Sequence, residues 1–313
     1  MRTVIDERFV LVVTGVDATA DEVIAELNRR GVPVARFDLA DFPGQVEFSA
    51  ELGDGGLSGV LDTPSRTVDL HRVRSVYYRR PGRPEWPDLP LDEARFAAED
   101  ARMGFGGILQ SLGSCRYVNH PRRTAAAEWK PAQLMAAAQL GFQVPATLIT
   151  NQAGQARDFA RRRGRIVYKP LTFYAQQDNA IWVGEVDPTE LDESLVGTAH
   201  MFQVAIEKQA DVRVTVVGDK VFPVRIESPL LDWRERYDLI ERYTVIEPSN
   251  GMVARLRSYL KHWGLWYGCF DFSIDTRGEW WFLECNPAGE WGWIAAETGL
   301  PIARAFADVL EAG

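Results

Sequence analysis

The sequence predicts a mixed α/β protein, with a parallel sheet near the N-terminus and antiparallel strands near the C-terminus. The apolar run FVLVVT (9–14) precedes a helical pattern at 20–30 and a second strand at 32–38. This β-α-β order is typical of a parallel sheet. Two pairs of apolar strands, each joined by a short glycine turn, occupy 212–227 and 267–286 and predict hairpins.

The composition excludes several classes of protein. The chain has 313 residues, enough for two or three domains, and its net charge of −9 argues against non-specific binding to nucleic acid. Three cysteines without a C-x-x-C motif and four dispersed histidines predict neither a disulfide framework nor a zinc site. No apolar run approaches the ~20 residues that span a bilayer, and no signal peptide is evident. We therefore expect a cytoplasmic protein without membrane contact.

The C-terminal hairpin carries the most informative polar residues. Its second strand, WWFLECN, places Glu284 and Asn286 on one face, because side chains alternate along a strand. A two-residue turn would set Glu284 opposite Asp271, whereas a three-residue turn would set Leu283 there instead. In the first register the three oxygen donors form one patch that suits Mg²⁺. An ordinary amphipathic hairpin with solvated polar residues is the alternative.

Basic side chains recur in segments that are otherwise apolar. Lys169 lies in the strand RIVYKPL, and Arg213 and Arg225 lie in two strands joined at a glycine turn. Buried cations are unfavourable unless they face anions, so these side chains are candidates for binding phosphate. The alternatives are a lysine that reaches solvent at the strand edge and arginines that pair with Glu227 or Asp211.

The order of these features along the chain indicates a site for magnesium and ATP. Lys130 on a helix comes first, followed by Lys169, Arg213 and then the oxygen donors of the hairpin. Basic groups that grip a triphosphate and oxygen donors that hold Mg²⁺ are the parts that such a site needs.

This arrangement resembles the ATP-grasp superfamily, and within it the chain is similar to the graspetide macrocyclases, the microviridin-type maturases of ribosomal peptides. The segments that carry the resemblance are VNHPRRTAAAEWKPAQL (118–134), GFQVPATLITN (141–151), IVYKPL (166–171), DVRVTVVGDKVFPVRIES (211–228), DWR (232–234) and CFDFSID…WFLECNPAGEW (269–291). The resemblance implies an α/β ATP-grasp fold with an N-terminal α/β domain (1–120), a central domain (121–205) and a C-terminal antiparallel-sheet domain with the metal site (206–313).

The resemblance also implies roles for individual residues. The nucleotide would be bound by Lys130 and Lys169 at the phosphates, Gln203, Ile206 and Glu207 around the adenine, Asp211 near the ribose, and Arg213. The catalytic residues would be Lys169, Arg213 and Arg225, with Arg213 on the γ-phosphate or acyl phosphate. The metal ligands would be Asp271, Glu284 and Asn286, holding two Mg²⁺ ions.

One loop departs from the family pattern. Many ATP-grasp enzymes have a glycine-rich phosphate loop after the second lysine, but TFYAQQDN (172–179) contains no glycine. A cradle of backbone amides is therefore not expected there. The loop is instead a candidate lid that would keep water away from a reactive acyl phosphate.

The implied reaction is ATP-dependent macrocyclisation of a ribosomal precursor peptide. An Asp or Glu side chain would be activated as an acyl phosphate, and a Ser/Thr hydroxyl or Lys amine of the same peptide would attack it, forming an ω-ester or ω-amide. Asp232 and Arg234 are candidate substrate contacts. The peptide's leader segment would bind near 180–200, where Glu190 and Asp192 lie in a segment (188–199) expected to be helical.

Two other functions stay open at the level of sequence. An ATP-grasp ligase that joins a free amino acid or small acid to an amine would need the same nucleotide site. A nucleotide-binding module without catalysis is less consistent with a chain that contains Lys169, Arg213 and all three metal ligands. The sequence identifies no general base, and a homodimer is one of the oligomeric states that it allows.

Overall fold

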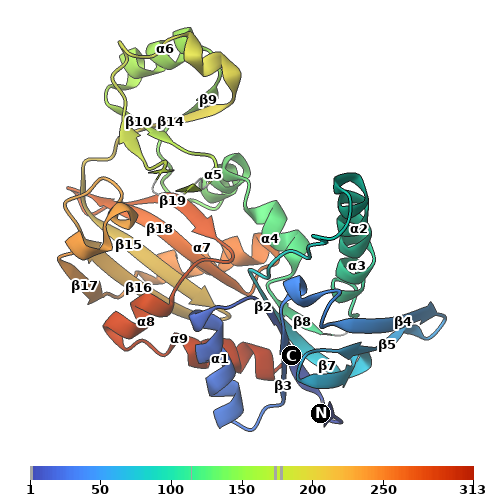
Figure 1. The fold of residues 1–313 in the computed structure, drawn as a ribbon. Helices are drawn as coiled ribbons and strands as arrows, with labels where there is room; N and C mark the ends of the chain where they lie inside the picture. Colours follow the sequence, from blue (N-terminus) through green and yellow to red (C-terminus); the bar gives the residue numbers. More distant parts are fainter. Residues whose placement is uncertain (1–2, 114, 173–174, 177–178) are drawn as a thin grey trace.

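The computed structural model describes residues 3–113, 115–172, 175–176 and 179–313. Figure 1 shows three lobes: an N-terminal lobe in blue to teal, a small central lobe in green to yellow at the top, and a C-terminal lobe in gold to red between them. In the described part of the chain, none of the helices has the length and apolarity needed to cross a bilayer.

The N-terminal lobe contains two four-stranded sheets. The first has the order β3-β2-β7-β8 with every neighbouring pair parallel, as the β-α-β pattern predicts, and the second has the order β1-β6-β5-β4. Every residue of β2 is buried, which explains its continuous apolar sequence. The elements are β1 (Thr3–Ile5), β2 (Phe9–Thr14), α1 (Ala18–Arg29), β3 (Val34–Phe37), β4 (Glu47–Gly53), β5 (Gly56–Asp62), β6 (Arg66–Asp69), β7 (Val73–Arg79), α2 (Leu91–Met103), α3 (Phe105–Leu109) and β8 (Arg116–Val118).

The central lobe is a four-stranded antiparallel sheet of order β13-β10-β14-β9, with helix α6 packed against it. Its elements are β9 (Thr147–Thr150), α6 (Ala153–Arg163), β10 (Ile166–Lys169), β11 (Ala175–Gln176), β12 (Asn179–Ala180), β13 (Gly184–Glu185) and β14 (His200–Val204). The prediction of a helix at 188–199 is wrong, because only a short 3-10 turn forms there, at Glu193–Gly197. Gly197 disfavours a longer helix.

The C-terminal lobe is a five-stranded antiparallel sheet of order β17-β16-β15-β18-β19. Its strands are β15 (Lys208–Val217), β16 (Lys220–Glu227), β17 (Arg242–Val245), β18 (Tyr267–Asp275) and β19 (Trp280–Asn286), and its helices are α7 (Asn250–Trp263), α8 (Gly292–Thr298) and α9 (Ile302–Glu311). Two helices that precede the central lobe in sequence, α4 (Pro121–Ala127) and α5 (Lys130–Gln139), also pack here. Their apolar residues share one core with α7 and this sheet, so their packing differs from the predicted grouping with the central domain.

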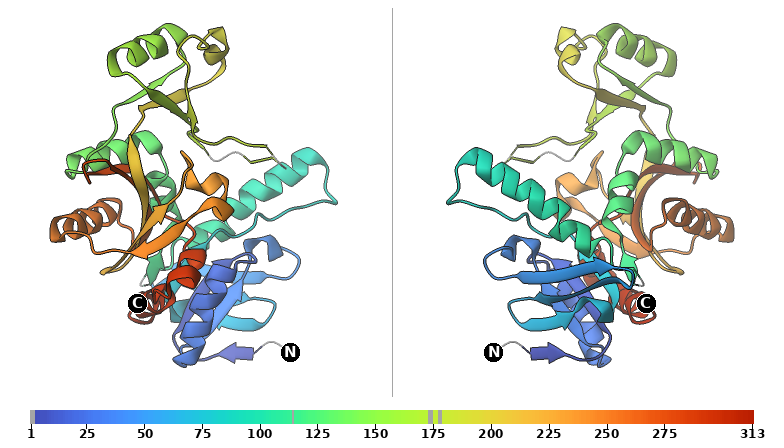
Figure 2. Two further views of the ribbon diagram at one scale, coloured as in Figure 1. Left: turned by 90° about the vertical axis from the view of Figure 1, so that its left-hand side faces the viewer. Right: turned by 90° about the vertical axis from the view of Figure 1, so that its right-hand side faces the viewer.

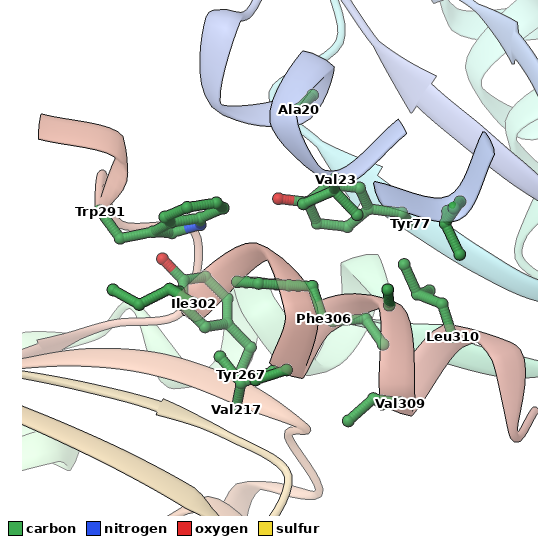
Figure 3. Packing of buried hydrophobic residues seen from close by; sticks show 14 of the residues in the cluster. Ala20, Val23, Tyr77, Val217, Tyr267, Trp291, Ile302, Phe306, Val309 and Leu310 are labelled. Carbon is green, nitrogen blue, oxygen red and sulfur yellow. The ribbon is translucent and has the colours of Figure 1, made fainter. Parts of the chain in front are cut away.

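An apolar core joins the N-terminal and C-terminal lobes (Figure 3). Phe306 of α9 packs against Tyr77 of the parallel sheet at 5.2 Å and against Tyr267 of the antiparallel sheet at 4.8 Å between ring centroids. Trp291 stacks on the same ring at 5.3 Å. The two views in Figure 2 confirm that α9 lies between the two lobes. This core fixes the end of β7 against the segment that follows β19, which places N-terminal residues beside the candidate site.

Candidate active site

In the C-terminal hairpin, Asp271 and Glu284 pair as predicted, although the turn is not the two-residue turn that this pairing would require. Phe272 pairs with Phe282, as a three-residue turn requires, but Asp271 pairs with Glu284, as a two-residue turn would give. The difference is absorbed by a β-bulge in which Leu283 is the extra residue. Because of the bulge, Leu283 and Glu284 line the same cavity although they are consecutive. The bulge therefore keeps both carboxylates together despite the longer turn.

Cations from three elements converge on these two buried carboxylates. Arg213 of β15 donates from one nitrogen to both oxygens of Asp271 at 2.8 Å. Lys130, at the start of α5, donates to Glu284 Oε2 at 2.5 Å, and Arg234 donates to its Oε1 at 2.7 Å. All of these groups except Arg234 were predicted as nucleotide or metal contacts, and Arg234 was predicted as a substrate contact. The structure brings them together.

The third predicted metal ligand lies at the same point. Asn286 Nδ2 is 3.4 Å from Asp271 Oδ2 and 3.3 Å from Glu284 Oε1. Asp232 of the DWR motif, together with Arg234, extends the cluster, since Arg234 forms two further bonds of 2.9 Å to its carboxylate. The motif thus links the predicted substrate contacts to the predicted metal ligands.

The two carboxylates differ in acidity. Burial by itself would raise the pKa of Glu284, but the charges of Lys130 and Arg234 outweigh it and hold the pKa well below its usual range. Burial raises the pKa of Asp271, to which the negative charge of Glu284 adds, although Arg213 opposes the shift. A divalent cation between the two groups would favour the ionised form of both.

Lys169 is buried at the end of β10, with 6% of its surface exposed, so it does not reach solvent at the strand edge. Burial lowers its pKa to about 8, and the negative charge of Glu284 opposes this effect. Contact with a phosphate would compensate the buried charge, which fits the predicted role of this lysine.

A narrow slot of about 60 Å³ runs from the central lobe to the two carboxylates. Its apolar walls include Pro145, Val167, Val183, Ile206, Phe272 and Leu283, and its polar lining includes Lys169, Gln203, Lys208, Asp211, Ser273, Asp271 and Glu284. The slot contains three of the residues predicted around the nucleoside, whereas Glu207 is exposed and outside its lining. Lys208 was not predicted; its ammonium group bonds to Asp211 at 2.5 Å.

A wider chamber of about 670 Å³ adjoins the slot, and Glu284 lines both. Its lining includes five cations, four aromatic rings, four acidic side chains and one amide: Arg80, Lys130, Lys169, Arg213, Arg234, Trp182, Trp233, Tyr237, Trp293, Glu128, Asp232, Glu284, Glu290 and Asn286. The slot and the chamber share Lys169, Arg234 and Glu284, so two reactants bound in them would meet at these residues.

The hairpin donors fit a hard cation that a nucleotide helps to bind. Among the described residues, no group of three or more His, Cys, Asp and Glu side chains could hold a metal by itself. Two carboxylates and the Asn286 amide are nevertheless a suitable set for Mg²⁺, which commonly takes one or two carboxylates and completes its shell with substrate phosphates and water. The buried Arg213 Nε has no partner among the described groups, which leaves a donor for an anion.

Arg225, predicted to be catalytic, does not lie at the site. It pairs with Val212 across the sheet, whereas Arg213 pairs with Val224, so the two arginines point to opposite faces. Arg225 bonds to Glu227 at 3.2 Å and lines neither the slot nor the chamber. The structural ion pair that the sequence left as an alternative is the observed arrangement.

The candidate lid and the candidate leader site lie in the central lobe. Residues 173–174 and 177–178 of the lid loop are outside the described residues, and the flanking strands β11 and β12 pair with each other. Glu190 and Asp192 line a groove of their own, separate from the nucleotide slot. Its floor is apolar (Tyr168, Leu191, Leu195, Phe202), and its rim is acidic (Glu185, Asp187, Glu190, Asp192).

Comparison with known proteins agrees with this geometry. The MvdD pre-ATP grasp domain family matches residues 9–124. A RiPP-associated ATP-grasp ligase of Chryseobacterium gregarium, solved with ADP and a leader and core peptide, has 26% identity and a TM-score of 0.90, with 97% of this chain and 96% of that chain covered. None of the curated proteins matches the chain in sequence.

Two macrocyclases of Microcystis aeruginosa are also similar. MdnC, solved with its precursor peptide MdnA, has 28% identity and a TM-score of 0.87, over 97% of this chain and 100% of that chain. MdnB has 29% identity and a TM-score of 0.83, over 99% of this chain and 100% of that chain. The predicted ATP-grasp fold is confirmed by these neighbours, which cover almost the whole chain.

Proposed function

We propose that this chain, which is similar in sequence and fold to ATP-grasp macrocyclases of ribosomal peptides, is an ATP-dependent ligase that closes rings in a precursor peptide. One observation carries the proposal: Lys130, Arg213 and Arg234 converge on two buried carboxylates where the slot meets the chamber. That geometry fits a transfer from ATP on one side to a peptide on the other.

The slot would bind ATP. Its apolar walls suit the adenine, Asp211 and Lys208 lie where a ribose and its phosphates could be held, and Lys169 faces the carboxylates at the inner end. ATP would replace the bonds that Lys130 and Arg234 now make to Glu284, since the same cations would then bind phosphate oxygens. Mg²⁺ held by Asp271, Glu284 and Asn286 would supply charge neutralisation at the transferring phosphoryl group.

The reaction would proceed in two steps. In the first, a carboxylate oxygen of the peptide attacks the γ-phosphorus and the bond to ADP breaks; Arg213 and Lys169 reduce the repulsion between the two anions. In the second, a hydroxyl or amine of the same peptide attacks the acyl carbon, phosphate leaves, and the nucleophile loses its proton. The product is an ω-ester or an ω-amide. The aromatic side chains of the chamber, including Trp233 and Trp293, would limit access of water to the acyl phosphate.

The leader segment of the peptide would bind the groove that contains Glu190 and Asp192. An apolar floor with an acidic rim suits a segment that carries apolar residues and a basic residue. The Chryseobacterium ligase was solved with a leader peptide, which supports a leader-dependent substrate for this chain as well.

Mass spectrometry tests the proposal directly. The protein is incubated with ATP, Mg²⁺ and each Ser/Thr- and Asp/Glu-rich peptide encoded beside its gene, and separately with free amino acids as acceptors. We expect one peptide to lose the mass of one water per ring, with one ADP released per ring. Product from free amino acids alone would favour the small-molecule ligase instead, and unchanged masses of all peptides would refute ring closure.

A further inference from the structure

Two consecutive arginines at the end of β7 have contrasting environments. Arg79 is 1% exposed, whereas half of the Arg80 side chain is exposed and lines the chamber. Arg80 has a φ of 43°, which is uncommon for a residue other than glycine, and Pro81 follows it directly. Unfavourable backbone conformations of this kind concentrate at functional sites.

Arg79 is fixed in the joint between the lobes. Its Nε donates to Asp17 Oδ2 at 2.8 Å, and one terminal nitrogen donates to Gly289 O at 3.0 Å. Its other terminal nitrogen lies 2.6 Å from Glu290 Oε2. Gly289 itself packs closely against Cys269 and Arg213, since a Cβ there would lie 2.6 Å from the Cβ of Cys269 and 2.9 Å from a terminal nitrogen of Arg213. Arg79 is therefore structural.

Arg80, in contrast, is held by a bond that can be exchanged. Its guanidinium group bonds to the other oxygen of Glu290. Glu290 also accepts a hydrogen bond from Thr19 at 2.9 Å and keeps the charge of Arg79 beside it. If Arg80 left, Glu290 would still be paired, so the exchange would leave no carboxylate without a partner.

The position of Arg80 relates it to the reacting groups. Arg213, the proposed contact of the γ-phosphate, donates to the backbone oxygen of Glu290 at 3.0 Å. Lys130, Arg213 and Arg234 bond to the proposed metal ligands, whereas Arg80 bonds to Glu290 on the chamber side. Glu290 therefore contacts both arginines, Arg213 through its backbone oxygen and Arg80 through its side chain. Arg80 lies on the chamber side, from which a peptide would enter.

On the basis of the proposed function, we propose that Arg80 is a substrate-positioning residue that exchanges Glu290 for an acidic side chain of the peptide. A guanidinium fork matches the two oxygens of a carboxylate, which would orient an Asp or Glu side chain toward the γ-phosphorus. Glu128 also lines the chamber, and its negative charge would repel an acidic peptide, so a cation is needed there.

A pair of glycine variants tests this inference. Arg80→Gly removes the guanidinium and also relieves the backbone, because glycine adopts a φ of 43° readily. Arg83→Gly is the matched control, since Arg83 is exposed on the same loop and lines neither the slot nor the chamber. Calorimetry in ADP and Mg²⁺ compares a synthetic peptide of alternating threonine and glutamate with its threonine–glutamine equivalent.

We expect the wild type and Arg83→Gly to bind the glutamate peptide roughly ten- to a hundredfold more tightly than the glutamine peptide. Arg80→Gly should lose this preference, Arg80→Lys should recover part of it, and ATP affinity should stay unchanged in every variant. A wild type without the preference, or Arg80→Gly with the full preference, overturns the inference. The result is separable from ring closure, because binding is measured without turnover.

Discussion

Glu284→Gln removes one negative charge from the centre of the site and keeps the size of the side chain. Glu284 is 5% exposed and accepts bonds from Lys130 at 2.5 Å and Arg234 at 2.7 Å. A bond to a charged group contributes about 1.5–3 kcal/mol, and glutamine can accept one of the two. We expect the free energy of unfolding to fall by roughly 2–3 kcal/mol, which leaves the protein folded.

The effect on turnover should exceed the effect on stability. Charge stabilisation by a bound metal contributes several kcal/mol to a transition state, and about 1.4 kcal/mol corresponds to a tenfold change in rate. Loss of one proposed carboxylate ligand should slow product formation roughly a thousandfold. ADP release and the mass of the peptide measure this, and urea unfolding measures the stability.

Glu279→Gln is the matched control for this prediction. It makes the same substitution in the same hairpin, at an exposed residue that accepts a hydrogen bond from Gln143 Nε2 at 3.1 Å. Its activity and stability should stay close to those of the wild type, since exposed contacts contribute little. A folded Glu284→Gln variant that retained wild-type turnover would refute the assignment of the metal ligands.

Three further predictions concern other parts of the site. ATP affinity should weaken as the pH rises through about 8, because Lys169 then loses the charge that binds phosphate. Equilibrium titrations of ATP from pH 7 to about 9.5 measure the affinity, and an affinity that does not change with pH would contradict the prediction. The Arg225→Ala variant should turn over ATP at a rate within about twofold of the wild type, whereas Arg213→Ala should lose product formation. Equal losses of activity would contradict the assignment of the two arginines to opposite faces of the sheet. Charge reversal of Glu190 and Asp192 to lysine should weaken leader binding measured by calorimetry and spare ATP binding, and unchanged leader affinity would place the leader elsewhere.

The C-terminal hairpin shows which structural features can be predicted from the local sequence pattern and which cannot. Alternation along a strand is a local property, so Glu284 and Asn286 could be assigned to one face from the sequence. The turn has three residues, for which simple pairing would have set Leu283 opposite Asp271. The bulge that restores the pairing depends on packing across the sheet, which no turn motif encodes.

The faces of the two arginines depend on the register of their hairpin, which the two-residue turn at Gly218-Asp219 sets by pairing Val217 with Lys220. Arg213 and Arg225 lie in adjacent strands of like composition, and only the register assigns Arg213 to the site and Arg225 to Glu227. No local sequence signal gives Arg80 a role, because Glu290, to which it bonds, is distant in the chain. A left-handed backbone at a residue before proline has no reliable sequence signal.

By itself, the sequence determined the local content of this protein: the β-α-β start, the C-terminal hairpins and the types and order of the residues that suit ATP and Mg²⁺. These follow from periodicity, turn residues and side-chain chemistry, which act over a few residues. The tertiary structure alone decided which charges meet. Strand register, the bulge at Leu283 and the apolar core around Phe306 set the distances between groups far apart in the chain, and electrostatic interactions depend on those distances.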